Sequence, residues 1–156
     1  MGIINSVEKV AIASDHGGFE LKEIVKEHLS SKGVELDDLG TFSSESVDYP
    51  DYAHLVAQRI AEGKNKRAIL ICGTGIGMSI TANRYRNVRA ALCNDVFSAK
   101  MSRQHNDANV IVLGGRVVGP GLALEITETW LMTEFDGGRH ARRIEKIENV
   151  NSNDKE

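Results

Sequence analysis

The chain has 156 residues, of which 41% are hydrophobic and 26% are charged, and its formal net charge is −3. This length and balance are typical of one globular domain with a full hydrophobic core, and they exclude a highly charged disordered chain. The small negative charge excludes a general attraction for nucleic acid or an anionic membrane, so any bound anion must be held by local groups.

Strand-like runs alternate with helical patterns along the chain. In chain order the predicted elements are strand 9–14, helix 19–29, strand 34–39, helix 51–61, strand 67–72, helix 78–85, strand 89–93, helix 96–104, strand 109–113, helix 122–133 and helix 139–147. The strands are short runs rich in Ile, Val, Leu and Ala, whereas the helices carry apolar residues at three- and four-residue spacing. Gly33 and Gly63 follow the first two helices, as expected for helix ends.

This alternation predicts an α/β fold: one doubly wound, Rossmann-like domain with a five-stranded parallel sheet and helices on both faces. Ligands in such folds bind outside the carboxyl ends of the strands. The candidate positions are therefore the segments after the first strand, after the third, and after the fourth or fifth. We expect residues 1–148 to form the domain and residues 149–156 to form a polar, disordered tail.

The cysteine content and the N-terminus indicate a cellular compartment. Cys72 and Cys93 have neither the spacing of a metal site nor that of a disulfide framework, which favours a reducing environment. Residues 1–10 lack the apolar segment of a signal peptide, and no apolar run reaches membrane-spanning length. We therefore expect a cytoplasmic protein with no membrane or nucleic-acid partner.

The strongest local signal is the run CGTGIGMS at residues 72–79, directly after the third strand. Three glycines at alternate positions allow a tight turn with its amides facing inward, and a helix is predicted to begin just beyond. Unpaired amides at such a turn favour a phosphate or a developing oxyanion, and they also favour the thiolate form of a nearby cysteine. Cys72 is therefore a candidate catalytic group.

Three other interpretations of this run must be weighed. A dinucleotide-binding loop needs GxGxxG after the first strand, whereas the spacing here is GxGxG after the third. A cysteine-dependent phosphatase loop needs a closing arginine, and Met78 stands at that position. The simplest alternative is a tight strand–helix turn in which Cys72 is only a small core residue.

Two further segments carry titratable side chains near predicted strand ends. Asp15 and His16 follow the first strand, where they suit substrate hydroxyls or phosphate; alternatively, Asp15 is a helix N-cap and His16 a surface residue. His105 and Asn106 lie just before the fifth strand. A histidine there suits proton transfer, although a histidine that interacts with a helix dipole is equally compatible with the spacing.

Basic residues gather after the fifth strand and in the last helix. Arg116 follows two glycines, and Arg139 and Arg143 share one helix face at i and i+4. Two guanidinium groups at that spacing suit a phosphate dianion. A solvated basic face on a terminal helix is the ordinary alternative.

Taken together, the segments ASDHGGFELK, DYPDYA, ILICGTGIGMSITAN, SRQHNDANVIVLGGRVVG and FDGGRHARR closely resemble the type B ribose-5-phosphate isomerases. That family also holds the galactose-6-phosphate isomerase subunits. The resemblance runs in the same order from about residue 10 to residue 147. CGTGxGxS together with RQHND is its most specific part.

The resemblance implies an enzyme of the non-oxidative pentose phosphate pathway. It would interconvert ribose 5-phosphate and ribulose 5-phosphate through a cis-enediolate, with no cofactor and no metal. Cys72 would be the base and Thr74 would serve the substrate oxygens. His105 would open the furanose ring with the help of Asp15. Family members with serine in place of the cysteine use a glutamate in the next helix, and this chain has neither change.

The resemblance also implies a binding site shared between subunits of a homodimer or homotetramer, with the last helix reaching a neighbouring subunit. The residues that would contact substrate are His16, Tyr49, Gly73, Gly75, Ile76, Gly77 and Asn106. The residues that would bind phosphate are His16, Arg116, Arg139 and Arg143. Two alternatives stay open: a six-carbon aldose phosphate as substrate, such as allose 6-phosphate or galactose 6-phosphate, and a non-catalytic phosphate-binding module.

Overall fold

The computed structural model describes residues 8–150, and within that range five parallel strands form one sheet in the order β2-β1-β3-β5-β4. The strands are β1 (Val10–Ser14), β2 (Leu36–Asp38), β3 (Ala68–Cys72), β4 (Ala90–Leu92) and β5 (Val110–Gly114). The three central strands are buried at every position, because helices cover both of their faces. The two edge strands are shorter and half-buried.

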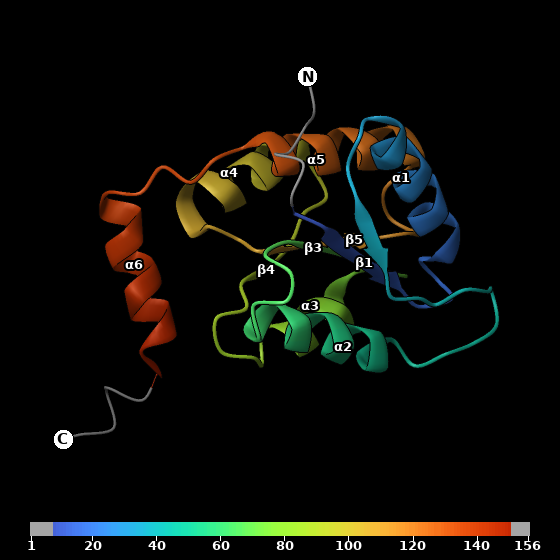
Figure 1. The fold of residues 1–156 in the computed structure, drawn as a ribbon, viewed down its shortest axis with the longest axis horizontal. Helices are drawn as coiled ribbons and strands as arrows, with labels where there is room; N and C mark the ends of the chain where they lie inside the picture. The colour runs from blue at the N-terminus through green and yellow to red at the C-terminus, as the bar shows by residue number, and fades with distance from the viewer. Residues whose placement is uncertain (1–7, 151–156) are drawn as a thin grey trace.

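The helices are α1 (Phe19–Ser31), α2 (Tyr49–Ala61), α3 (Ile76–Ala82), α4 (Val96–Asn106), α5 (Pro120–Met132) and α6 (Arg139–Glu148). α1, α4 and α5 cover one face of the sheet and α2 and α3 cover the other (Figure 1). This is the predicted doubly wound α/β architecture. Among the described residues, no helix is both long enough and apolar enough to cross a bilayer.

Alternate residues of each central strand enter different cores. Ile69 and Ile71 of β3 pack beneath α1 and α5 around the fully buried Trp130, whereas Leu70 and Cys72 face α2 and α3. This division follows from the two-residue period of a strand, which sends neighbouring side chains to opposite faces. Cys72 is therefore delivered to the α2–α3 face at the carboxyl end of β3.

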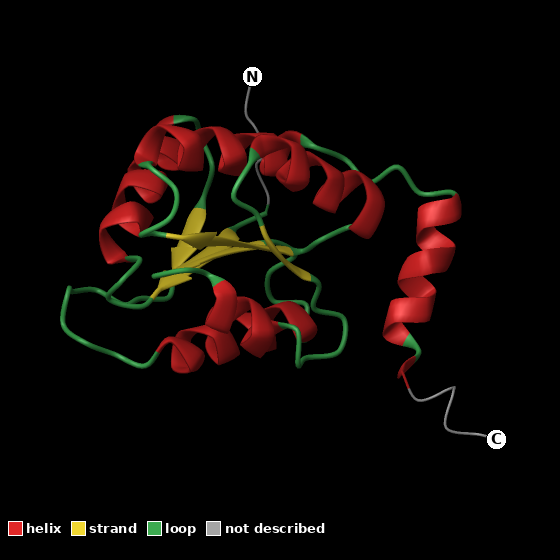
Figure 2. Cartoon of the chain, turned by 180° about the vertical axis from the view of Figure 1, so that it is seen from behind, coloured by secondary structure: helices red, strands yellow, loops and turns green. Residues whose placement is uncertain are grey.

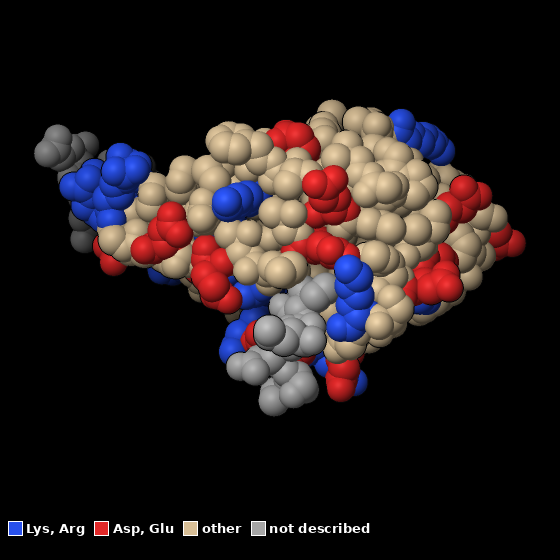
Figure 3. Space-filling model, turned by 90° about the horizontal axis from the view of Figure 1, so that it is seen from above, with Lys and Arg blue, Asp and Glu red and all other residues tan. Residues whose placement is uncertain are grey.

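α6 lies outside both helical layers, at the end of the molecule beside α4 (Figure 2). The ring of His140 in α6 stacks on that of His105 in α4, with ring centroids 4.3 Å apart. At the other end of the helix, Glu148 accepts a hydrogen bond from the Arg89 guanidinium at 2.7 Å. Basic side chains gather at this end of the molecule (Figure 3), where the helix sequence is RHARRIEKIE.

Element boundaries agree with the sequence predictions to within three residues at every end, and two of the shifts have clear reasons. α2 begins at Tyr49 rather than at residue 51, because Pro50 is well tolerated in the first turn of a helix. α3 covers residues 76–82 rather than 78–85. It ends early because the Asn83 side chain bonds both the Ser79 carbonyl in the helix and the backbone of Ala90 in β4. Of the expected tail, residues 151–156 lie outside the described range.

Candidate active site

The turn after β3 holds Cys72 in a fixed backbone frame. The Gly75 amide donates a hydrogen bond to the Cys72 Sγ at 3.1 Å, and Cys72 is only 4% exposed. Gly75 has φ +80°, and a Cβ there would lie 2.5 Å from the Leu92 side chain. Only glycine meets both conditions, so the glycine signal reflects a real geometric demand.

The loop after β1 packs directly against this turn. A Cβ on Gly17 would lie 3.2 Å from the Gly73 amide nitrogen. Buried Asp15 accepts a hydrogen bond from the Gly18 amide at 3.1 Å, so its carboxylate holds the entry into α1. The alternative in which Asp15 is the N-cap is wrong, because the N-cap of α1 is Gly18 and it has no side-chain capping bond. The Asp15 carboxylate instead lies beside the Cys72 turn, since a Cβ on Gly17 would touch both Asp15 Oδ1 and the Gly73 amide nitrogen.

His16 has a defined tautomer. Its Nδ1 accepts a hydrogen bond from the Val47 amide at 3.2 Å. A ring nitrogen that accepts from an N–H carries no proton, so the proton of the neutral ring resides on Nε2. His16 therefore presents a hydrogen-bond donor at Nε2, as recognition of phosphate or hydroxyl oxygen requires.

A buried ion pair anchors the loop that carries Val47. The Lys22 side chain is fully buried, and its Nζ lies 2.7 Å from the Asp38 carboxylate at the end of β2. Asp38 also accepts from Lys26 at 2.8 Å and from the Gly40 amide at 3.0 Å. Burial opposes ionisation of Asp38, but these donors outweigh it and hold the pKa of Asp38 below its usual value.

β5 supplies an arginine to the same edge of the sheet. The Arg116 amide donates to the Gly73 carbonyl at 3.0 Å, and its guanidinium lies 3.6 Å from where a Cβ on Gly73 would stand. Arg116 and His16 line a common cavity of about 410 Å³, together with Ser44. Within the described part of the chain, no carboxylate pairs with the Arg116 guanidinium. A cation and a neutral donor in one cavity suit an anionic group such as phosphate.

Tyr49 reaches the turn from the first residue of α2. A Cβ on Gly77 would lie 2.4 Å from the Tyr49 ring, so the two residues are in direct contact. Thr74 accepts a hydrogen bond from the Ile76 amide at 3.3 Å, which leaves the Thr74 hydroxyl proton available to another acceptor. The carboxyl edge of the sheet therefore unites Asp15, His16, Tyr49, Cys72, Gly73, Thr74, Gly75, Ile76, Gly77 and Arg116.

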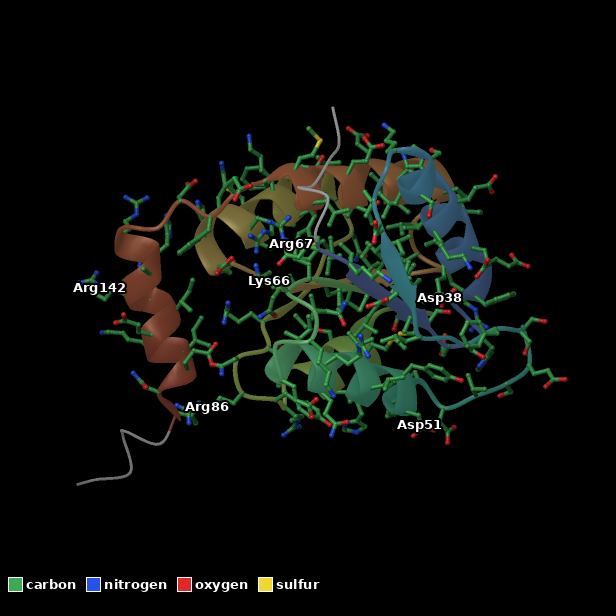
Figure 4. The ribbon with its side chains drawn as sticks, in the orientation of Figure 1. Asp38, Asp51, Lys66, Arg67, Arg86 and Arg142 are labelled. Carbon is green, nitrogen blue, oxygen red and sulfur yellow. The ribbon has the colours of Figure 1, made fainter. Side chains whose placement is uncertain are left out.

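The remaining predicted site residues lie at the opposite edge of the sheet, the amino edge, where the strands begin. α4 runs back along the sheet, so His105 and Asn106 end up beside the amino ends of the strands. The Asn106 carbonyl accepts a hydrogen bond from Arg89, which immediately precedes β4. Arg67, just before β3, and Asp38, at the end of β2, mark the two edges in Figure 4. Within a single chain, Cys72 therefore lies at the edge of the sheet opposite to four predicted site residues: His105, Asn106, Arg139 and Arg143.

This second group is basic and largely exposed. Arg139 and Arg143 are exposed on α6, and His105 is half-buried. Desolvation of the ring, the neighbouring His105 and the two arginines lower the pKa of His140. Stacked imidazoles beside guanidinium groups can move protons and hold an anion.

Some contacts at both edges could not be predicted from the types of the residues in the sequence. The Val47 contact to His16 uses a backbone amide, so no side-chain signal marks it. Asp136 and His140 join His105 because the segment after α5 folds back onto the end of α4. The sequence FDGGRHARR indicates a phosphate-binding role for Arg139 and Arg143, and it gives no sign of this contact between His140 and His105.

Comparison with known proteins identifies the family. Residues 10–147 match the family model described as Ribose/Galactose Isomerase. The ribose-5-phosphate isomerase B of Escherichia coli (strain K12) is 50% identical over 141 residues, which cover 90% of this chain and 95% of that protein.

Solved structures agree in fold. A ribose 5-phosphate isomerase from Thermotoga maritima is 58% identical, with a TM-score of 0.90 over 92% of this chain and 99% of that one. The type B enzyme of Mycoplasma genitalium with bound ribulose-5-phosphate is 42% identical, with a TM-score of 0.87 over 91% and 95% of the two chains. On this sequence match and the agreement in fold, the chain belongs to the ribose/galactose isomerase family.

Proposed function

We propose that this protein interconverts ribose 5-phosphate and ribulose 5-phosphate, with Cys72 as the base that moves the proton. The observation that carries the proposal is the buried Cys72 thiol, which accepts a hydrogen bond from the Gly75 amide. Asp15, His16 and Arg116 lie at the same edge of the sheet, in the loops that pack against this turn. The names of the relatives and the bound ribulose-5-phosphate in one solved structure support the same substrate.

The proposed reaction transfers a proton between two adjacent carbons. The Cys72 thiolate removes the proton from C2 of the open-chain aldose, and the electron pair moves into a C1–C2 double bond. The carbonyl oxygen at C1 becomes an oxyanion, which is stabilised by turn amides of residues 73–77 other than those of Gly75 and Ile76, because these two already donate to Cys72 and Thr74. The C2 hydroxyl gives its proton to the C1 oxygen through the Thr74 hydroxyl, so that the C2–oxygen bond becomes the carbonyl of the ketose. Return of the proton from Cys72 to C1 gives the ketose, and neither a metal nor a redox cofactor is required.

Ring opening requires a second proton-transfer group, for which we propose His105 of a second subunit. His105 cannot serve the Cys72 of its own chain, because the two residues lie at opposite edges of the sheet. A two-fold dimer that places one edge against the other creates two equivalent sites. A dimer is then the minimum assembly, and a tetramer of such dimers is compatible with the same contact.

α6 offers a surface for that contact. Ile147 and Val150 are 53% and 74% exposed, and they line a cavity of about 640 Å³ between the helix and the loop before β4. Exposed apolar residues beside a cavity mark a surface that a partner covers. In the proposed dimer, Arg139 and Arg143 of one subunit bind the phosphate together with His16 and Arg116 of the other. Asn106 of the first subunit contacts the sugar, and Asp15 of the second orients the sugar ring.

The reaction is tested with purified protein and a panel of sugar phosphates. Ribose 5-phosphate, allose 6-phosphate and galactose 6-phosphate are compared in parallel, with a chelator control and with deuterium exchange followed by NMR. We expect the five-carbon substrate to be preferred and solvent deuterium to appear at the transferred position. Transfer without any solvent exchange, or a clear preference for a six-carbon sugar, would contradict the assignment.

The shared site is tested by mixing two inactive variants. Cys72→Ala and His105→Ala are each expected to be inactive, but a mixed dimer carries one site with both native groups. Random mixing should therefore restore about a quarter of wild-type activity. Recovery is measured after subunits are exchanged in mild denaturant, with each variant treated alone as the control. No recovery, despite mixed dimers shown by native mass spectrometry, would refute the shared site.

We also infer a cytoplasmic setting. Cys72 and Cys93 are both free thiols, and a base that acts as a thiolate requires reducing conditions. Detection of the intact thiols in protein isolated from its native source would support this inference.

A further inference from the structure

Two imidazole rings from different helices lie face to face at the amino edge of the sheet. The ring of His140 in α6 stacks on that of His105 in α4, with centroids 4.3 Å apart and only 12° between the ring planes. His140 is buried and His105 is half-buried. The protons and lone pairs of imidazole nitrogens lie in the plane of the ring, so the two rings contact each other by their faces and not by a hydrogen bond.

The backbone between α5 and α6 places His140 in this stack. The Asp136 amide donates to the Gln104 carbonyl at 3.1 Å, which ties the linker to the last turn of α4. Gly137 and Gly138 follow with φ +65° and +56°, a conformation that residues with a side chain rarely adopt. The His140 amide then donates to the Gly137 carbonyl at 3.1 Å. The linker therefore reverses its direction at a fixed point and delivers the His140 ring to the stack.

His105 needs such a contact because its own rotamer does not fix the plane of its ring. Rotation about the bond that leads to an imidazole ring has broad minima, and a small rotation redirects both ring nitrogens. Within residues 8–150, no hydrogen bond reaches a ring nitrogen of His105. The stacked ring of His140 is thus the contact that restrains the plane of the His105 ring.

The charge state of His140 suits this task. Desolvation, the neighbouring His105 and the guanidinium groups of Arg139 and Arg143 lower the pKa of His140, although the Asp136 carboxylate opposes them. His140 is therefore neutral near pH 7. A neutral partner adds no positive charge that would oppose the uptake of a proton by His105.

We propose that His140 is a positioning residue, whose stacked ring holds the His105 imidazole in the plane that aims its nitrogen at the ring oxygen of the sugar in the neighbouring subunit's site. This inference rests on the proposed role of His105 in ring opening. It predicts that loss of the stack slows ring opening and leaves both the proton transfer at Cys72 and the phosphate contacts unchanged.

Two reactions of the same enzyme separate ring opening from proton transfer. Turnover of ribose 5-phosphate starts from a furanose ring and requires ring opening. Ribulose 5-phosphate is already open, because its O5 carries the phosphate and cannot close on the C2 carbonyl. In D₂O, Cys72 removes a proton from C1 of this ketose and returns a deuteron, which NMR detects. This exchange requires the base and the phosphate contacts but no ring opening.

Two substitutions of His140 distinguish a flat ring from bulk alone. His140→Leu keeps an apolar side chain and loses the flat face, so kcat for ribose 5-phosphate should fall by roughly tenfold to a hundredfold, as expected when a reacting group is misplaced. KM and the deuterium exchange of ribulose 5-phosphate should not change. His140→Phe keeps a flat ring without nitrogens, so its kcat should stay within about threefold of wild type.

His105→Ala is the reference for a complete loss of ring opening. It should lose turnover of ribose 5-phosphate more strongly than His140→Leu and retain the deuterium exchange of ribulose 5-phosphate. Circular dichroism and native mass spectrometry check the fold and the assembly of each variant.

Three results would overturn the inference. Unchanged turnover in His140→Leu would show that the stack has no role. Equal losses of turnover and exchange in that variant would show a structural role only. Turnover in His140→Phe as low as in His140→Leu would show that the nitrogens of His140 matter and its flat face does not.

Failure of the proposed function gives a different pattern. A wild type that does not convert ribose 5-phosphate would refute the proposed function, and normal turnover in His105→Ala would refute the ring-opening role; either result removes the basis of the inference. Failure of the inference alone leaves wild type and His105→Ala as expected and changes only the behaviour of the His140 variants.

Discussion

The carboxyl edge of the sheet, where the strands end, and the amino edge, where the strands begin, hold functional groups in different ways. At the carboxyl edge, Cys72 is buried, its sulfur accepts an amide hydrogen bond, and its carbonyl accepts another from Gly115 at 2.7 Å. At the amino edge, Arg139 and Arg143 are exposed on a helix that lies outside both layers. The edge with the proposed base holds its groups by hydrogen bonds within the chain, whereas the other edge presents its side chains outward.

This difference matches the precision that each task needs. Proton abstraction from carbon depends on the exact position and charge of one atom, which a strand end with a fixed turn provides. Phosphate binding tolerates long side chains on a peripheral helix, because two guanidinium groups can adjust to the anion. The comparison predicts that changes at the first edge act on the rate of chemistry and changes at the second act on substrate affinity.

The largest effect is expected for Cys72→Ala. Loss of a general base commonly costs roughly 10²–10⁴ in rate, so kcat should fall by that factor while the fold survives the removal of one sulfur atom. kcat and circular dichroism are the measurements. Cys93→Ala is the matched control, since Cys93 is also buried but lies after β4, and it should keep most of its activity. Turnover that persists in Cys72→Ala would contradict the role of Cys72 as the base, and with it the contrast between the two edges.

The next largest effect is on stability, at the loop of the carboxyl edge. Asp38→Asn leaves the fully buried Lys22 ammonium without its main partner, which should lower the free energy of unfolding by about 3 kcal/mol. Urea denaturation at neutral pH measures the loss. Glu45→Gln, on the exposed loop beyond, should change stability little. An equal loss in both variants would show that the ion pair has no special role.

The same ion pair predicts a pH dependence. The pKa of Asp38 is lowered in the folded state, so its contribution is complete above the unfolded value of about 3.9 and is lost as pH falls through the lower folded value. Wild type should therefore lose stability as pH drops below about 4. Asp38→Asn should show a shallower decline there, because Asn does not titrate. Parallel acid profiles for the two proteins would contradict this.

A smaller effect is expected for Arg139→Ala and Arg143→Ala. Each removes charge-assisted hydrogen bonds worth about 1.5–3 kcal/mol, so KM should rise by roughly tenfold to a hundredfold and kcat should change less. Steady-state kinetics separate the two parameters. Arg142→Ala is the matched control, because it removes the same charge from the same helix at a residue to which no role is assigned. A rise in KM for Arg142→Ala alone would contradict the assignment of phosphate binding to Arg139 and Arg143.

The smallest effect concerns the second thiol. Burial raises the pKa of Cys93 to about 11, so Cys93 remains a neutral thiol at neutral pH. Iodoacetamide should therefore inactivate the folded enzyme by modifying Cys72 first, and Cys93 should react only after unfolding. Peptide mass spectrometry alongside activity assigns the site. Inactivation that tracks modification of Cys93 would be the contrary result.

The sequence predicts the elements well because their patterns are local. The strand VIVLG and the glycine run after residue 72 specify a buried strand and a tight turn with little help from the rest of the chain. The order of the strands is less accessible, since β5 lies between β3 and β4 although it follows both in sequence. The weaker apolar run AAL of β4 fits its place at the sheet edge.

What the sequence determined by itself is the chemistry available: a cysteine in a glycine turn, a histidine after RQ, and paired arginines one helical turn apart. What only the tertiary structure decided is where these groups stand. The direction of α4 places His105 at the edge opposite Cys72, and the fold-back after α5 stacks His140 against it. Such placement depends on the path of whole elements through space, which no local pattern of residues contains.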